Sequence, residues 1–156
     1  MSEVAGLLPT PDQVGMFVKD REAAMRQYGP LFGPFHLMES TIDGADFRGK
    51  PSSFSQKIAF GKSGEFEVEF IEWTAADPQL QAYLDSLPPG LHHMRYRVDD
   101  YQSWLKKLAG QGYHPILSKT FSDGTAFAYL ERPGDPLVIE ILQMAGGYGD
   151  REPGLT

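Results

Sequence analysis

Two well-separated segments of this chain resemble each other closely enough to be copies of one structural unit. Asp12–Asp20 (Asp-Gln-Val-Gly-Met-Phe-Val-Lys-Asp) can be laid on His92–Asp100 (His-His-Met-Arg-Tyr-Arg-Val-Asp-Asp). Both alternate in polarity as a strand does, and both end at an aspartate that can cap a helix by accepting from free first-turn amides. The pattern predicts a helix after each, over Arg21–Tyr28 and Tyr101–Gln111.

Each predicted helix is followed by three predicted strands, so each half reads as βαβββ. The strands are expected at Phe35–Ser40, Phe54–Gly61 and Glu65–Thr74 in the first half, and at Tyr113–Thr120, Thr125–Glu131 and Leu137–Met144 in the second. A repeated unit that cannot bury its apolar face alone must pack on its copy. The chain is therefore predicted to be an α+β protein in which two tandem βαβββ modules form a curved mixed sheet around a cavity.

The length of 156 residues predicts one domain spanning 1–156, because two ordinary domains need a longer chain. The first module is placed at about 12–75, a linker at about 76–90, the second module at about 91–144 and a tail at 145–156. Asp43-Gly44, Gly49 and Pro51 predict that Thr41–Ser53 is an exposed loop.

Composition excludes several classes of protein. The chain has no cysteine, which rules out disulfides, thiolate catalysis and sulfur-ligated metals. A net charge of −7 argues against a nucleic-acid partner, and no apolar run reaches the length of a membrane span. No secretory signal is visible at the N-terminus, so a cytoplasmic location is expected.

Strand alternation assigns side chains to faces. In the first strand Gln13, Gly15 and Phe17 are expected to face the cavity. In the matching strand His93, Arg95 and Arg97 take these places, and His92 shares the helix-facing side with Met94.

Glu140 is the only charge in Leu137–Leu142, a segment that is apolar on both faces. A buried carboxylate needs a cation, a metal or a proton, so Glu140 forms either an ion pair with Arg95 or Arg97 or part of a metal site. Glu69 has the equivalent place in the first half. With Gln13 and His93 these carboxylates occupy duplicate positions, and such a mostly oxygen set suits magnesium, manganese, cobalt, nickel or zinc.

Four segments in order resemble the vicinal oxygen chelate superfamily of glyoxalases, bleomycin resistance proteins and dioxygenases. They are Asp12–Asp20, Val68–Trp73 (Val-Glu-Phe-Ile-Glu-Trp), Gly90–Met94 (Gly-Leu-His-His-Met) and Pro136–Gln143 (Pro-Leu-Val-Ile-Glu-Ile-Leu-Gln). Within this superfamily the segments most resemble those of glyoxalase I and methylmalonyl-CoA epimerase-like proteins. The resemblance implies one divalent metal ion held by Gln13, Glu69, His93 and Glu140, with His93 preferred to His92 and Glu69 to Glu72.

The resemblance also implies an activity: a metal-dependent isomerase, epimerase or lyase that moves a proton next to a metal-bound oxygen of a small carbonyl or acyl substrate. Glu140 is the first candidate for the base and Glu69 the second. A ring-cleaving dioxygenase is disfavoured, because it needs two histidine ligands.

The expected substrate site has an apolar wall and a cationic anchor. The wall is assigned to Phe17, Trp73, Phe127 and Tyr129. Arg95 or Arg97 would hold a substrate carboxylate or phosphate; for each, an ion pair with Glu67 or Glu69 is the alternative. A homodimer is expected. A non-catalytic protein that binds or sequesters a small molecule on the same fold is the alternative function.

Overall fold

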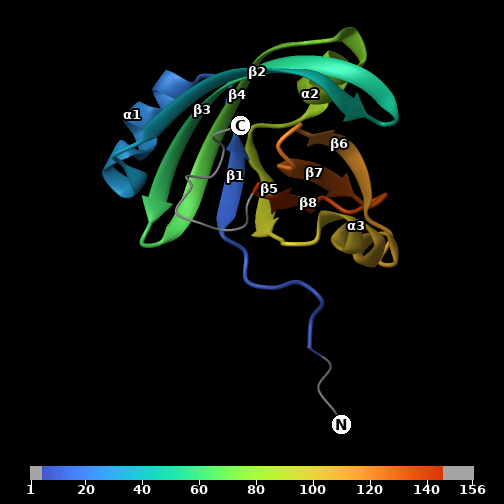
Figure 1. The fold of residues 1–156 in the computed structure, drawn as a ribbon. Coiled ribbons are helices and arrows are strands. Elements are labelled where there is room, and N and C mark those ends of the chain that lie inside the picture. The colour runs from blue at the N-terminus through green and yellow to red at the C-terminus, as the bar shows by residue number, and fades with distance from the viewer. Residues whose placement is uncertain (1–4, 146–156) are drawn as a thin grey trace.

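The computed structural model describes residues 5–145, and in it the chain forms βαβββ twice (Figure 1). The first half comprises β1 (Gln13–Phe17), α1 (Arg21–Phe32), β2 (His36–Phe47), β3 (Lys50–Ser63) and β4 (Phe66–Ala76). Helix α2 (Pro78–Ser86) leads to β5 (Gly90–Arg97), α3 (Tyr101–Ala109), β6 (His114–Thr120), β7 (Ala126–Glu131) and β8 (Val138–Gln143). The predicted tail lies outside the described residues, apart from residue 145.

The strands form one sheet in the order β1-β4-β3-β2-β6-β7-β8-β5, and β5 pairs with β1 to close it. The pairs β1–β4 and β5–β8 are parallel, whereas β1 and β5 run antiparallel where the two halves meet. The α+β class and the curved mixed sheet of two βαβββ modules are confirmed. The curved sheet is also closed into a barrel, which was not predicted, because β2 pairs with β6 through Asp46 and Phe47.

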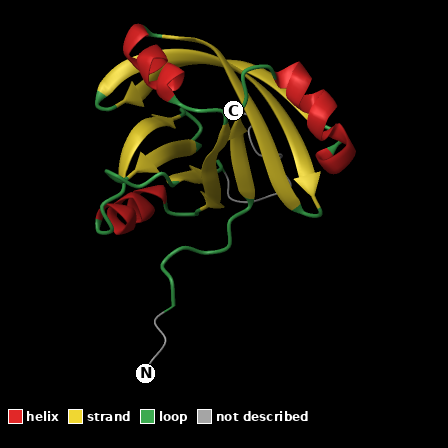
Figure 2. Ribbon diagram, turned by 180° about the vertical axis from the view of Figure 1, so that it is seen from behind, coloured by secondary structure: helices red, strands yellow, loops and turns green. Residues whose placement is uncertain are grey.

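Helices α1 and α3 lie on the outside of the closed sheet (Figure 2). Helix α2 instead packs Leu80 and Leu84 against inward-facing residues of the sheet. Asp20 accepts from Ala23 N and Asp100 accepts from Ser103 N, so both predicted caps form. No helix among residues 5–145 has the length and apolar character needed to cross a membrane.

Helices α1 and α3 each cover the face of the sheet that strand alternation assigned to them. Beside α1 the outward apolar side chains are Val14, Met16, Val18, Val68 and Phe70; beside α3 they are Met94, Tyr96, Val98, Ile139 and Ile141. This packing turns the alternate residues of β1, β4, β5 and β8 inward.

Helix α1 is longer than expected. It continues through Gly29-Pro30 to Phe32 instead of ending at Tyr28. Proline removes one hydrogen bond, but the last turn still closes, because Gly33 N–H donates to Gly29 O at 2.9 Å.

The predicted exposed loop over Thr41–Ser53 is wrong. These residues belong to a long β2–β3 hairpin, in which Ile42 and Phe47 are buried. The register shifts between Ile42 and Ala45, so Asp43-Gly44 marks a bulge and not a loop. The turn lies at Arg48-Gly49, with φ angles of 49° and 87°, the positive values that a tight hairpin turn requires.

Candidate functional site

The four predicted metal ligands lie together where the two halves meet. Strands β1 and β5 are neighbours, and each is flanked by the last strand of its own half. Gln13, Glu69, His93 and Glu140 therefore come from four adjacent strands, and all are buried. One chain supplies the whole set.

The donor atoms converge on the ring of His93. Its Nε2 lies 3.0 Å from Gln13 Oε1, 3.5 Å from Glu69 Oε1 and 3.6 Å from Glu140 Oε1. Ligands about 2.1 Å from one divalent ion stand about 3.0–3.4 Å from each other, so these separations are close to those of one coordination sphere.

An orphaned atom supports this fit. Glu69 Oε1 is buried and has no hydrogen-bond partner. A bound metal would give this atom a partner. The donor set of one imidazole and three oxygens also suits a divalent metal. Among residues 5–145 no group of three or more histidine, cysteine, aspartate or glutamate side chains is by itself arranged to hold an ion.

Gly15 explains how the His93 ring reaches this position. The two residues pair across β1 and β5. A Cβ at Gly15 would lie 2.0 Å from His93 Cε1, so any side chain there would occupy the space of the imidazole. The glycine of the Gln-Val-Gly motif thus serves the close approach of the ring to the backbone.

Glu67, which was not among the expected site residues, orients Gln13. Gln13 Nε2 donates to Glu67 Oε1, and this turns the amide oxygen of Gln13 towards His93. Burial raises the pKa of Glu67, and the charge of Arg95 opposes that rise. The sequence signal was available, because Glu67 alternates with Glu69 on the same strand face.

The two arginines are engaged in ion pairs. Arg95 donates to Asp12 at 3.1 and 2.9 Å and to Glu67 at 3.4 Å, and Arg97 Nε donates to Asp12 at 2.6 Å. The alternative of an Arg95–Glu67 ion pair is thus what the structure contains. Within the described residues no ion pair joins Glu140 to either arginine; Glu140 lies next to His93 and Tyr129 instead.

Burial controls the protonation of the site. It raises the pKa of Glu140 to about 7, although the charge of Arg95 opposes the shift. Burial, together with the charge of Glu140, raises the pKa of Glu69 well above its usual range. Burial also lowers the pKa of His93, which keeps the imidazole neutral, the form that binds metals.

A mostly apolar cavity adjoins the two carboxylates. Its lining residues are Met38, Ile42, Phe54, Gln56, Ile58, Glu69, Arg95, Phe127, Tyr129, Glu140 and Leu142. Of the expected substrate residues, Arg95, Phe127 and Tyr129 are among them. Phe17, Trp73 and Arg97 are not; the rings of Phe17 and Trp73 contact each other at 5.1 Å.

The lining residues Met38, Ile42, Phe54, Gln56 and Ile58 were missed. They come from β2 and β3, whose hairpin was expected to be partly a loop. The alternation of Phe54, Gln56 and Ile58 was a usable signal, since it places all three on one face of a strand.

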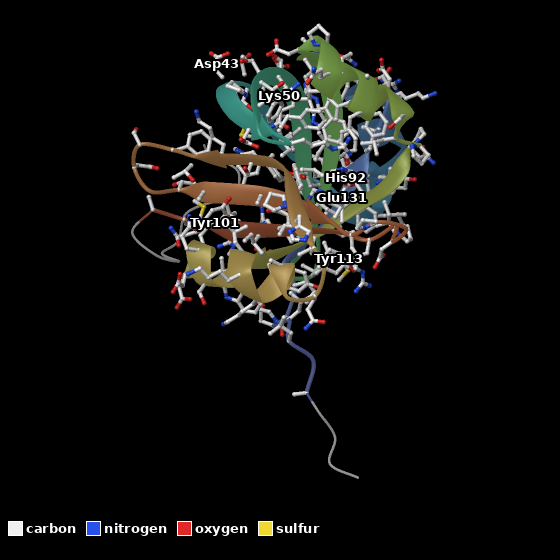
Figure 3. All side chains as sticks on the ribbon, turned by 90° about the vertical axis from the view of Figure 1, so that its right-hand side faces the viewer. Asp43, Lys50, His92, Tyr101, Tyr113 and Glu131 are labelled. Carbon is white, nitrogen blue, oxygen red and sulfur yellow. The ribbon has the colours of Figure 1, made fainter. Side chains whose placement is uncertain are left out.

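Strict alternation predicted that His92 lies on the helix-facing side of β5, and this prediction is wrong. Gly15 pairs with His93 but Met16 pairs with Leu91, so His92 is the extra residue of a β-bulge. Its ring contacts Trp73 at 5.1 Å and Tyr129 at 5.2 Å, next to His93. Figure 3 labels His92 in the middle of the molecule, between the two halves.

Comparison with known proteins agrees with this geometry. Residues 12–129 match the Glyoxalase/Bleomycin resistance protein/Dioxygenase superfamily, and the chain belongs to that superfamily. Its members include epimerases, glyoxalases and dioxygenases, and they typically bind a divalent metal. The sequence has no match among curated proteins.

Solved structures share the fold at low sequence identity. A variant of Streptomyces coelicolor methylmalonyl-CoA epimerase in complex with 2-nitronate-propionyl-CoA has 18% identity and a TM-score of 0.62, covering 91% of this chain and 99% of that one. Methylmalonyl-CoA epimerase from Mycobacterium tuberculosis has 19% identity and a TM-score of 0.58, with 92% and 93% covered. A variant of Streptomyces coelicolor 4-hydroxymandelate synthase has 17% identity and a TM-score of 0.58, with 95% and 52% covered.

Proposed function

We propose that this protein is a metal-dependent isomerase or epimerase that moves a proton next to an oxygen of a small carbonyl or acyl substrate. The observation that carries the proposal is the pair Glu69 and Glu140. Both are buried, both border an apolar cavity, and both stand within 3.6 Å of His93 Nε2. Buried carboxylates with raised pKa values at a cavity wall are typical of acid–base sites.

Gln13, Glu69, His93 and Glu140 would hold the ion. When bound, a divalent metal polarises a neighbouring oxygen and makes the adjacent C–H more acidic. Glu140 is the proposed base, because its pKa of about 7 lets it take and return a proton near neutral pH. Tyr129 hydrogen-bonds Glu140, which stabilises the ionised carboxylate and fixes its direction.

The cavity around these residues would exclude water and hold the apolar part of a substrate. Phe127 and Tyr129 form its wall on one side, and Ile42, Phe54 and Ile58 form it on the other. Arg95 contributes charge to the site but is already paired with Asp12 and Glu67. We therefore propose that it fixes the ligand strands, and that an acyl group is held by the apolar wall.

The test has two stages. First, the protein is reconstituted with cobalt, nickel, manganese or zinc and its metal content is measured; we expect about one ion per chain. Second, methylmalonyl-CoA, chosen because epimerases of that name share the fold, is incubated in D₂O and deuterium entry at its acidic C–H is followed by NMR. We expect exchange in the wild type, its loss in Glu140→Gln, and no change in Glu65→Gln, which replaces an exposed carboxylate in the β3–β4 turn.

The outcomes separate the candidate functions. Metal binding without exchange on methylmalonyl-CoA or on smaller carbonyl substrates would favour the non-catalytic binding protein. A stoichiometry near zero with every ion, without thermal stabilisation, would contradict the proposal as a whole.

A further inference from the structure

The bulge in β5 brings two histidine rings into direct contact. His92 Nδ1 lies 3.0 Å from His93 Nδ1, and the rings are nearly perpendicular, at 89°. Both are buried, with 7% and 1% of their surface exposed. His92 Nε2 is buried without a hydrogen-bond partner. A buried polar ring with one free nitrogen needs an explanation beyond packing.

The neighbouring hydrogen bonds fix which nitrogen carries each proton. Gln13 Nε2 donates to Glu67, so it is the amide oxygen of Gln13 that faces His93 Nε2. An amide oxygen only accepts, so His93 Nε2 must carry its proton in this arrangement. His93 Nδ1 is then the acceptor, and His92 Nδ1 donates to it.

Metal binding demands the opposite arrangement. A ligand nitrogen must offer its lone pair, so His93 Nε2 must lose its proton and His93 Nδ1 must carry it. His93 Nδ1 then becomes a donor, and the group opposite must accept. Only a residue able to both donate and accept at this point serves both states.

We propose that His92 is the positioning residue of His93, and that the hydrogen bond between the two rings reverses when a metal binds. This inference rests on the proposed metal site. In the metal-bound form His92 Nδ1 accepts from His93 Nδ1, and His92 carries its own proton on Nε2. Each ring keeps one proton and stays neutral; the protons change nitrogen by exchange with water.

The surroundings of His92 agree with this role. A nitrogen–nitrogen contact of 3.0 Å joins the two buried rings, and such a contact requires one ring to donate and the other to accept. Trp73 and Tyr129 pack edge-on against His92, at interplanar angles of 78° and 74°, and so fix the plane of its ring. An apolar residue would fill the space but could not accept from His93.

The first experiment reads the tautomers directly. Two-dimensional ¹H–¹⁵N spectra of histidine-labelled protein are recorded without metal and with zinc, which is diamagnetic, and the histidine signals are assigned with single variants. We expect His93 to change from the Nε2–H to the Nδ1–H form and His92 to change in the opposite sense. Bound zinc with either ring unchanged would overturn the inference and leave the metal site standing, whereas no zinc binding at all would refute both.

A variant series tests the same point through affinity. His92→Asn keeps an acceptor near the position of Nδ1, and His92→Phe keeps the ring but no acceptor. We expect zinc affinity within about threefold of wild type for His92→Asn, and a loss of about 10–100-fold for His92→Phe, the range typical of partners that orient a ligand. His114→Asn, which replaces an exposed histidine at the start of β6, is the control and should bind as wild type. Wild-type affinity in His92→Phe would mean that His92 only packs; should that variant unfold, the wild-type spectra decide alone.

Discussion

The two halves place their proposed metal ligands at equivalent positions, yet they surround them differently. Gln13 and His93 align in the internal repeat, as do Gly15 and Arg95. In the first half Gly15, two residues after Gln13, has no side chain, and the His93 ring occupies that space. In the second half the equivalent residue is the buried Arg95, which forms ion pairs with Asp12 and Glu67. The two copies thus carry the proposed ligands at the same positions and support them with different neighbouring residues.

The hairpins differ even more. Strands β2 and β3 have 12 and 14 residues, whereas β6 and β7 have 7 and 6. The longer hairpin supplies Met38, Ile42 and Phe54 to the cavity and reaches β6 to close the sheet. The copies therefore diverge in the cavity wall, while the strands that carry the proposed ligands remain alike.

The largest expected effect is a loss of stability on removal of Arg95, the buried arginine that joins the second half to the first; Arg97 is its more exposed counterpart on β5. Arg95→Leu should lower the free energy of unfolding by about 3–5 kcal/mol, because it leaves the buried Glu67 carboxylate without its cation. Arg97→Leu should cost at most about 1 kcal/mol, because its side chain is 25% exposed while that of Arg95 is 3% exposed. Urea denaturation of the three proteins measures the difference. Equal losses would mean that Arg95 has no special part in the support of the second half.

Gly15→Ala tests the corresponding feature of the first half. The added Cβ would overlap the His93 ring, so we expect a loss of about 1–3 kcal/mol in stability and a clear loss of metal affinity. Gly6→Ala is the matched control, because a Cβ there meets nothing within 4 Å. Thermal melts and zinc titrations check both. A stable Gly15→Ala protein with wild-type affinity would show that His93 does not need this space.

The smallest expected effect compares the two carboxylates through pH in the metal-free protein. Glu140 has a folded-state pKa of about 7 against an ordinary value of 4.5, so its burial costs nothing below pH 4.5 and costs increasingly more as the pH rises to 7. Glu140→Gln should therefore melt a few degrees above wild type at pH 8, in a chelator, and the gap should narrow at pH 5. Glu69→Gln should behave alike, with its gap still growing at higher pH, because the pKa of Glu69 is raised well above its usual range. If Glu140 were instead half of a structural ion pair, its loss would lower the melting temperature.

Strand alternation and repetition were enough to predict the modules and the ligand strands, because inward and outward residues differ plainly in β1, β4, β5 and β8. They failed where the backbone departs from regular pairing. The bulge at His92 shifts one residue to the other face, and no propensity marks it. Asp43-Gly44 indicates a break, but long-range pairing turns that break into a bulge. Asp12 precedes its strand, so its pairing with two arginines depends on tertiary contact alone.

The antiparallel contact of β1 with β5 has a consequence for how the protein is made. Gln13 and Glu140 stand near opposite ends of the described chain, and the four side chains meet only after β8 has docked beside β5. A ribosome-bound chain that has emerged as far as β4 carries Gln13 and Glu69 and lacks His93 and Glu140. A metal held by the proposed set would therefore bind only after the second half has closed on the first, and its binding would report that closure.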